Sequence, residues 1–281
     1  QDAWVVGNVG RLHPDKFKAG LDQIKSNMAD AEVDALIAIG GEGTLKGAKW
    51  LSDNGVPVVG VPKTIDNDVN ATDYTFGFDT AVSVATDAID RLHTTAESHD
   101  RVMIVEVMGR HVGWIALHSG MAAGAHAILI PEVRTPMSQV AEWVQQVHDR
   151  GRSPLVVVAE GFVPEGHDDP LAEAGVEASG RPRLGGIGEW VTREIEEMTG
   201  IETRSTILGH IQRGGAPTAT DRVLSTRFGM GAVDLVAQRR WGQMVAANGT
   251  EIISIPMSAA LKGLKKVPVS RYDEAKILFG R

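Results

Sequence analysis

A short polar segment that follows an apolar run carries side chains able to support phosphoryl transfer. The segment Pro62–Asp68 supplies two carboxylates, a hydroxyl and an amide within a few positions. If the preceding strand ends here, the turn lies beyond the carboxyl edge of a parallel sheet, where open α/β sheets bind ligands. Asp66 and Asp68 cannot point the same way in a tight turn, so one can face a substrate hydroxyl and the other a cation. Taken alone, the segment is better interpreted as a solvated Asx turn.

A glycine turn one strand earlier strengthens the first interpretation. Gly40–Thr44 follows the strand-like run Val33–Ile39 and precedes a helical pattern. Glycines allow close backbone approach, and the first N–H groups and the dipole of a helix favour an anion. Glu42 suits such a site only if a magnesium ion lies between its carboxylate and the phosphates. The pattern is neither a Walker motif nor a dinucleotide motif, and a Gly-Gly turn can be structural only. Acidic turns on two consecutive strands nevertheless favour a metal-assisted phosphate site.

The elements that must position these turns alternate between strands and helices. Strand-like apolar runs cover residues 33–39, 56–61, 101–107, 126–131, 155–160 and 202–207. Helical patterns such as 80–96 and 137–150 lie between them. This alternation predicts an α/β fold with mainly parallel sheets covered by helices on both faces. The polar segment 163–183 is predicted to be a mobile loop, and Asn248–Thr250 a hairpin turn.

Composition narrows the class of protein. The chain has 281 residues with 43% hydrophobic content, enough for a large core in one domain or two lobes. It has no cysteine, which excludes disulfides and thiolate metal sites. No apolar run reaches the roughly 18 to 20 residues that cross a bilayer. The net charge of -8 argues against nucleic acid or acidic membranes as partners. We therefore expect a soluble cytoplasmic enzyme.

Two further motifs complete a resemblance to a known family. Val107–Trp114 and Leu208–Gly215, together with the acidic and glycine turns, resemble the motifs of 6-phosphofructokinases in order and spacing. The resemblance runs from about Val33 to the C-terminus. Within the family, the chain resembles bacterial members of the actinobacterial kind. It implies phosphoryl transfer from ATP to the C1 hydroxyl of fructose 6-phosphate, which yields fructose 1,6-bisphosphate in glycolysis. It also implies two Rossmann-like lobes.

The resemblance also implies the extent of each lobe. A phosphoryl-donor lobe would contain residues 1–77 and 212–262, and a fructose 6-phosphate lobe residues 78–211 and 263–281. Family members open with a strand and a glycine turn that lies against the nucleotide phosphates. This sequence shows no such segment, so we expect the donor lobe to be N-terminally incomplete. Arg11 is loosely similar to an early arginine that reaches toward the transferred phosphate.

Residue roles on the donor side follow from the same resemblance. Asp66 matches the catalytic base that accepts the proton of the C1 hydroxyl, and Thr64 matches a phosphate contact. Asp68 matches a residue associated with Mg²⁺, and Glu42 is expected to share that ion. The residues expected to bind the donor are Arg11, Gly41, Glu42, Gly43, Thr44 and Lys63.

The sugar phosphate is expected to meet a second group of residues. In the family, the counterparts of His210 and Arg213 bind fructose 6-phosphate within one subunit, whereas those of Arg101 and Arg204 reach across from a neighbour. The chain is therefore expected to form a dimer or tetramer with shared sites. Each arginine alone could instead be a surface ion-pair partner. The remaining sugar contacts are Met108, Gly109, Arg110 and Glu160, together with Thr64 and Asp66; Arg110 is also expected near the transferred phosphate.

The phosphoryl donor is less clearly specified. Relatives of this family that use pyrophosphate usually carry an acidic residue where this chain has Gly43 and a lysine where it has Lys63, and ATP users have glycine at both. Glycine at 43 leaves room for a nucleotide α-phosphate, whereas Lys63 excludes neither donor, so ATP is predicted. His93 stands where many bacterial members of the family have an effector-binding arginine, so the resemblance predicts weak or absent activation by ADP.

Two other classes remain open. Lipid and NAD kinases share a similar glycine turn but do not account for Thr64–Asp68 combined with His210–Arg213. A noncatalytic or truncated member of the family is the stronger rival, because the missing segment normally completes the nucleotide site.

Overall fold

The computed structural model describes residues 14–168, 170, 172–176, 182–184 and 186–281. Arg11 therefore lies outside the described residues. The chain divides into two compact units, each made of two stretches of sequence. The first unit comprises Gln1–Gly77 and Ala219–Lys265, and the second comprises Phe78–Thr218 and Lys266–Arg281.

The first unit contains a mostly parallel sheet. Its elements are α1 (Pro14–Asp30), β1 (Leu36–Gly40), α2 (Glu42–Asp53), β2 (Val58–Pro62), α7 (Ala219–Ala237), β9 (Gln243–Asn248), β10 (Glu251–Pro256) and α8 (Met257–Ala260). The strand order is β1-β2-β9-β10, in which β1, β2 and β9 are parallel. The antiparallel β9–β10 pair turns at Gly249, whose φ is 57°, so the predicted hairpin is confirmed.

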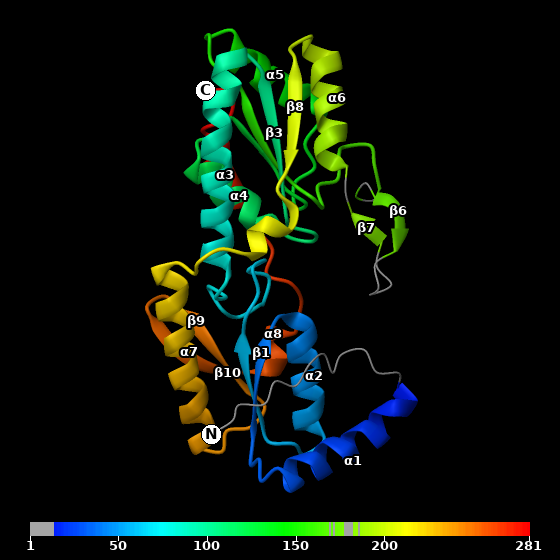
Figure 1. Ribbon diagram of the computed structural model, residues 1–281, viewed down its shortest axis with the longest axis vertical. Coiled ribbons are helices and arrows are strands. Elements are labelled where there is room, and N and C mark those ends of the chain that lie inside the picture. The colour runs from blue at the N-terminus through cyan, green and yellow to red at the C-terminus, as the bar shows by residue number, and fades with distance from the viewer. Residues whose placement is uncertain (1–13, 169, 171, 177–181, 185) are drawn as a thin grey trace. The chain divides into compact units, whose positions relative to one another are not determined.

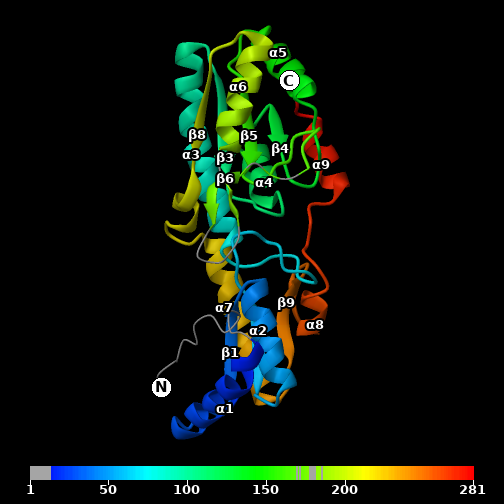
Figure 2. The same ribbon diagram turned by 90° about the vertical axis from the view of Figure 1, so that its right-hand side faces the viewer.

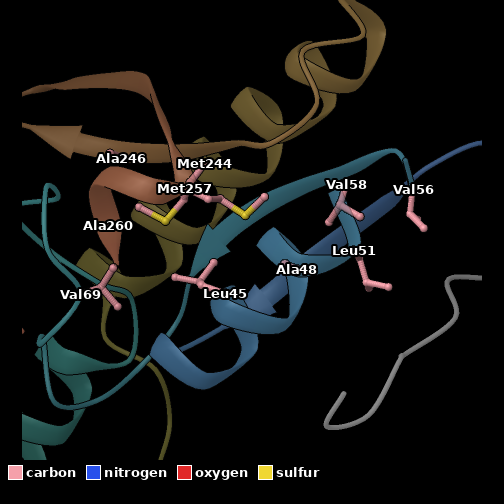
Figure 3. Packing of buried hydrophobic residues seen from close by; sticks show 10 residues of the cluster. All are labelled: Leu45, Ala48, Leu51, Val56, Val58, Val69, Met244, Ala246, Met257 and Ala260. Carbon is pink, nitrogen blue, oxygen red and sulfur yellow. The ribbon is translucent and has the colours of Figure 1, made fainter. Parts of the chain in front are cut away.

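Hydrophobic packing covers both faces of this sheet. Helix α2 lies on one face and α7 on the other (Figure 1). On the α2 face, Met244 and Met257 lie beside Leu45 within a buried cluster (Figure 3). A Cβ at Gly60 would lie 3.0 Å from Leu45 Cδ2 and 3.1 Å from Met257 Sδ, so the packing at this position is tight. On the α7 face, Phe228 packs against strand residues of β2 and β9. Strand β2 is thus buried on both faces, which holds its carboxyl end in place.

The second unit contains a fully parallel four-stranded sheet. Its elements are α3 (Phe78–His99), β3 (Val102–Val107), α4 (Trp114–Ala122), β4 (Ala127–Leu129), α5 (Met137–His148), β5 (Leu155–Ala159), β6 (Ala172–Val176), β7 (Pro182–Leu184), α6 (Ile187–Thr199), β8 (Thr203–Ile207), the 3₁₀ helix η2 (Gly209–Arg213) and α9 (Val269–Lys276). The strand order is β4-β5-β3-β8, and every pair is parallel. Helix α6 runs along β3 and β8 (Figure 1), and α9 lies beside β4 (Figure 2).

The predicted α/β class is confirmed, with helices covering mainly parallel sheets. The prediction of a loop at 163–183 was wrong in part, because β6 and β7 pair as a short antiparallel ribbon in this segment. Among the described residues, no helix is both long and apolar enough to cross a bilayer.

The unit boundaries differ from the predicted division at two places. Residues 212–218 belong to the second unit, because Gln212 is bonded to the residue that follows β3 and Thr218 to the first turn of α3. Residues 263–265 belong to the first unit, because the Lys265 side chain is bonded to residues 67–73. The sequence near residues 212–218 and 263–265 contains no pattern that predicts these tertiary contacts.

Candidate active site

The acidic turn and the glycine turn lie next to each other in the first unit. Gly40, at the end of β1, is the register partner of Pro62 at the end of β2. The Lys63 N–H donates to the Gly40 carbonyl at 2.9 Å. A Cβ at Gly41 would lie 3.5 Å from Thr64 Cβ. The two turns therefore meet at the carboxyl edge of the sheet, as expected for a ligand site.

The start of α2 presents free backbone donors to this edge. Gly41 is the N-cap residue, with φ -82°, and no side chain caps the helix. The first N–H groups of α2 can thus receive an anion. A Cβ at Gly43 would meet no described atom within 4 Å, which agrees with the open space inferred from the glycine. Thr44 is exposed in the same turn, one residue further along the helix.

Hydrogen bonds hold the acidic turn in its shape. The Asp66 N–H donates to Thr64 Oγ1 at 3.2 Å, and the Thr75 hydroxyl donates to the Thr64 carbonyl at 2.8 Å. Asn67 has a φ of 52°, in the left-handed region that non-glycine residues rarely adopt. Its Oδ1 accepts from the Thr75 N–H at 3.0 Å. Asn67 is nearly fully buried, so its amide acts as a brace for the turn rather than as a ligand.

Lys265 is a component of this turn that the sequence did not reveal. Its ammonium donates to Asn67 Oδ1 at 2.9 Å and to the carbonyls of Thr72 and Asp73 at 2.9 and 2.7 Å. Its own N–H donates to the Asp68 carbonyl at 2.9 Å. Burial lowers the pKa of Lys265 to about 8, although the charges of Asp73 and Asp68 act in the opposite direction. The residue lies far along the chain from the turn and in no motif.

Three carboxylates approach one another at this edge. Burial, together with the negative charges of Asp66 and Glu42, raises the pKa of Asp68 to about 6, although a backbone hydrogen bond and the charge of Lys265 act in the opposite direction. Glu42 also pairs with Lys46, at 2.8 Å between Nζ and Oε1. A divalent cation would relieve this repulsion.

The donor set fits magnesium in one particular way. No group of three or more potential ligands among His, Cys, Asp and Glu gathers around one point in the described part of the chain. Magnesium, however, is usually held by one or two carboxylates plus substrate phosphates and water. Asp68 and Glu42 satisfy that requirement, because their charges act on each other and the start of α2 lies beside them.

In the second unit, three turns meet at the carboxyl ends of β3, β5 and β8. The Met108 N–H donates to Gln212 Oε1 at 3.3 Å, which joins the turn after β3 to η2. The Glu160 N–H donates to the Val107 carbonyl at 2.8 Å, and the Gly161 N–H to the Gly109 carbonyl at 3.1 Å. The predicted sugar contacts that this edge brings together are Met108, Gly109, Arg110, Glu160, His210 and Arg213.

The turn after β3 depends on glycine. Gly109 has a φ of 145°, and a Cβ there would lie 2.7 Å from the Val112 carbonyl oxygen. A Cβ at Gly161 would lie 2.0 Å from the Arg110 carbonyl oxygen. The backbone of this turn therefore packs closely against the end of β5, and only glycine fits at both positions.

The 3₁₀ helix η2 carries two side chains whose nitrogen atoms can contact a phosphate. His210 and Arg213 are exposed, whereas Gln212 between them is 1% exposed. Gln212 Nε2 donates to the Gly209 carbonyl at 3.0 Å, and its Oε1 accepts from Met108. Sequence reasoning missed Gln212, because only its burial distinguishes it from its exposed neighbours.

Arg101 and Arg204 lie at the opposite edge of the same sheet. Arg101 precedes β3, and Arg204 is near the start of β8. β8 ends at Ile207, so at roughly 3.3 Å of rise per residue about 10 Å of strand lies between Arg204 and the turn that leads into η2. Both side chains pair with Glu202, at 3.1 Å from Arg101 Nε and 2.6 Å from Arg204 Nη2 to Oε1. The structure therefore does not bring these two arginines to the sugar-binding turns of their own unit.

A buried glutamate supports the start of α4. The Gly113 N–H lies 3.1 and 3.0 Å from the two carboxylate oxygens of Glu132. The Val267 N–H donates to Glu132 Oε1 at 2.9 Å. Burial raises the pKa of Glu132, while hydrogen bonds from Val267 and Gly113 lower it. Sequence reasoning gave Glu132 no role.

Comparisons with known proteins agree with this geometry. Residues 6–236 match the family model described as Phosphofructokinase. A pyrophosphate–fructose 6-phosphate 1-phosphotransferase of Amycolatopsis mediterranei is 59% identical over 96% of this chain and 79% of the relative. An ATP-dependent 6-phosphofructokinase of Corynebacterium efficiens is 58% identical over the same shares. The solved phosphofructokinase of Saccharomyces cerevisiae matches with a TM-score of 0.76 and 31% identity, over 90% of this chain and 35% of the yeast chain.

Proposed function

Because the chain belongs to the phosphofructokinase family, we propose that it transfers the terminal phosphoryl group of ATP to the C1 hydroxyl of fructose 6-phosphate. The product is fructose 1,6-bisphosphate. The observation that carries the proposal is the acidic turn Thr64–Asp68 beside the uncapped start of α2. Carboxylates next to an anion-binding helix end are what a metal-assisted phosphoryl transfer requires.

The first unit would hold the phosphoryl donor. The N–H groups at the start of α2, in the turn Gly41–Thr44, would bind phosphate oxygens, with Thr64 and Lys63 beside them. Asp68 and Glu42 would hold Mg²⁺, which supplies charge neutralisation at the transferred group.

Asp66 would act as the general base. It is half-buried at the carboxyl edge of the sheet, where a substrate hydroxyl can reach it. As the C1 oxygen attacks the terminal phosphorus, its proton passes to the Asp66 carboxylate and the bond to the leaving phosphate breaks. The phosphoryl group passes directly between substrates, so no covalent enzyme intermediate forms. Arg110 would stabilise the charge that develops on the transferred group.

The second unit would hold the sugar phosphate. His210 and Arg213 would bind the 6-phosphate, because the exposed guanidinium of Arg213 and the ring nitrogens of His210 can form hydrogen bonds to a phosphate. Glu160 would accept hydrogen bonds from sugar hydroxyls, and the Met108–Gly109 backbone would lie along the ring.

Arg101 and Arg204 would serve a site of a neighbouring chain. Their place at the amino edge of the sheet, opposite the edge that carries η2, supports contact with a sugar phosphate bound elsewhere. We therefore propose a closed homo-oligomer, a dimer or tetramer, whose sugar sites are shared. A cytoplasmic location fits its substrates. His93, whose Nε2 lies 2.8 Å from the Ala123 carbonyl, supports weak activation by ADP.

Pyrophosphate is the second candidate donor. Lys63 is exposed beside the glycine turn, and relatives named for each donor are similarly close to this chain. We favour ATP, because the open space at Gly43 can take an α-phosphate that pyrophosphate lacks.

One experiment tests both the activity and the donor. The purified chain is mixed with fructose 6-phosphate, Mg²⁺ and either ATP or pyrophosphate, and fructose 1,6-bisphosphate is measured. Formation with ATP at the higher kcat/KM is expected. A preference for pyrophosphate would overturn the choice of donor, and no product with either would favour a noncatalytic member of the family.

A further inference from the structure

A four-residue segment, Leu264–Val267, is bonded to the acidic turn at its first end and, through Glu132, to the turn after β3 at its second end. The chain passes from the first unit to the second between Lys265 and Lys266. We call residues 264–267 the connector. On the first-unit side, Leu264 forms a β-bridge with Val69. Lys265 is bonded through its backbone to Asp68 and through its ammonium to Asn67 and the next loop.

On the second-unit side, the connector reaches the turn after β3 through Glu132. The Val267 N–H donates to Glu132 Oε1 at 2.9 Å, and the same carboxylate accepts from the Gly113 N–H. Gly113 ends the turn that begins at Met108, and it caps α4. A Cβ at Gly113 would lie 2.3 Å from the Ile130 side chain, so this backbone has little room to shift.

Neither charged side chain is available to a substrate. An ammonium has three N–H donors, and those of Lys265 are taken up by the oxygens of Asn67, Thr72 and Asp73. A carboxylate only accepts, and both oxygens of Glu132 face backbone N–H groups. Their bonds end instead on turns that carry proposed site residues.

We infer that Lys265 and Glu132 are positioning residues of the phosphoryl-transfer reaction: the connector fixes the turn of Asp66 and Asp68 at one end and the turn of Met108–Arg110 at the other. This inference rests on the proposed function. Nothing in the family match or the names of the relatives assigns these residues a role.

The two ends predict different kinetic effects. Asn67 holds a left-handed conformation between Asp66 and Asp68, so loss of the Lys265 ammonium lets the base leave its productive position. Such a loss acts on kcat. Glu132 supports the backbone that lies along the sugar, so its loss weakens binding of fructose 6-phosphate and acts on KM.

Two conservative substitutions test the inference. Lys265→Met keeps the unbranched stem and removes the ammonium, and Glu132→Gln keeps the shape and removes one acceptor. We expect Lys265→Met to lower kcat by about 30-fold, with KM for fructose 6-phosphate changed less than about threefold. We expect Glu132→Gln to raise that KM by about tenfold, with a smaller change in kcat. The exposed controls Lys262→Met and Glu197→Gln should leave both constants unchanged.

Hydrogen exchange supplies a readout that does not depend on turnover. Amides of residues 66–75 should exchange faster in Lys265→Met, and those of 107–114 faster in Glu132→Gln, with the rest of each unit unchanged. Lys265→Arg, which keeps the charge and its donors, should recover most of kcat and most of the protection, even if the methionine variant folds poorly.

Three results would overturn the inference. Unchanged exchange in both turns would show that the anchors do not hold them. If both variants showed the same changes in kcat and KM, and if amides exchanged faster throughout the chain, the two residues would have a purely structural role. An arginine variant as impaired as the methionine variant would exclude the ammonium as the anchor. If the wild-type chain gives no product, the proposed function fails, whereas the exchange measurement still decides whether the connector holds the turns.

Discussion

At the scale of single residues, the acidic turn separates two roles that similar side chains could share. Asp68 lies close to Glu42 and Asp66, so a bound cation would offset the repulsion between these negative charges. Asp66 is half-buried and its N–H is bonded to Thr64, which keeps the turn fixed around its carboxylate. This division supports the proposed roles of Asp66 in proton transfer and of Asp68 in metal binding.

Replacing the proposed base should affect the chemical step alone. Asp66→Ser keeps a small polar group but cannot accept the proton, so kcat should fall by about 10³-fold while KM for fructose 6-phosphate changes little. Steady-state kinetics with ATP measure both constants. The exposed control Asp22→Ser should behave as wild type. Near-normal turnover of Asp66→Ser would remove this residue from the role of base.

Protonation of one buried histidine should limit stability in mild acid. His126 is 4% exposed, and its Nδ1 accepts from the Leu155 N–H at 3.0 Å. Burial lowers the pKa of His126 from 6.5 to about 4, assisted by the charges of Arg152 and His93. The unfolded chain therefore binds this proton more readily. The stabilisation, on the order of 3 kcal/mol, is complete above pH 6.5 and is lost as the pH falls toward 4.

Denaturant unfolding between pH 7.5 and 4.5 measures this contribution. His126→Asn places an amide oxygen near the position of Nδ1 and cannot titrate, so its free energy of unfolding should vary less with pH than that of the wild type. Parallel pH profiles of the two proteins would assign the acid sensitivity to other groups.

Part of the site could be predicted residue by residue, and part could not. Glu42, Asp66 and Asp68 follow consecutive strands, so a parallel sheet must bring them to one edge. Lys265 and Gln212 act through hydrogen bonds to residues distant in the sequence. These hydrogen bonds form only when both segments are packed in the folded chain. The residue types alone, a lysine and a glutamine, do not predict them.

At the scale of elements, the start of α2 is where donor choice should be adjustable. Gly43 is exposed, and a Cβ there meets nothing within 4 Å, so a side chain can be added without strain. A carboxylate at this position would repel and displace an α-phosphate while leaving the remaining N–H groups in place.

Gly43→Asp should shift the preference from ATP toward pyrophosphate by at least tenfold in the ratio of kcat/KM values. The two donors are compared at equal Mg²⁺ and fructose 6-phosphate. Gly43→Asn has a similar volume without the charge and should shift the ratio less. An unchanged ratio in the aspartate variant would place the α-phosphate elsewhere.

The turn after β3 should tolerate no side chain at its first glycine. Gly109→Ala forces a Cβ to 2.7 Å from the Val112 carbonyl at a φ of 145°, so the turn must move or strain by about 1–3 kcal/mol. We expect KM for fructose 6-phosphate to rise about tenfold, with a lower melting temperature. Gly229→Ala in α7 is the matched control, because that exposed helical position has open space and should gain about 0.5–1 kcal/mol. Normal sugar binding by Gly109→Ala would separate this turn from the substrate.

Strands and helices were easier to predict than the way they end. The apolar runs identified β2, β3 and β5 because strands buried on both faces need continuous apolar residues. The segment 163–183 is polar, and its β6–β7 ribbon depends on cross-strand pairing that composition does not encode. Residues 212–218 follow η2 into the second unit for a similar reason, since Thr218 is bonded to α3.

At the scale of the whole molecule, the place of Arg204 makes a prediction about assembly. Arg204 and Asp66 serve different sites if sugar pockets are shared between chains. Co-refolded Asp66→Ser and Arg204→Ala subunits should therefore regain on the order of a quarter of wild-type activity, because half of randomly mixed dimers contain one intact site of two.

Each variant refolded with itself is the control and should stay nearly inactive. Sedimentation of the mixture establishes the size of the active species. A fully active monomer, or a mixture no more active than its components, would place Arg101 and Arg204 in surface ion pairs with Glu202 only.

Because the first unit is made of two separate stretches of sequence, its two parts are synthesised at different times. Strand β2 must pair with β9, yet the entire sheet of the second unit is synthesised between them. Val59 and Val61 stay uncovered until α7 has been made, so the growing chain exposes an unfinished sheet while all four strands of the second unit's parallel sheet are synthesised. Until β9 is available to pair with β2, the apolar faces of β2 are open to wrong contacts, so the first unit is the part of the chain most exposed to misfolding during synthesis.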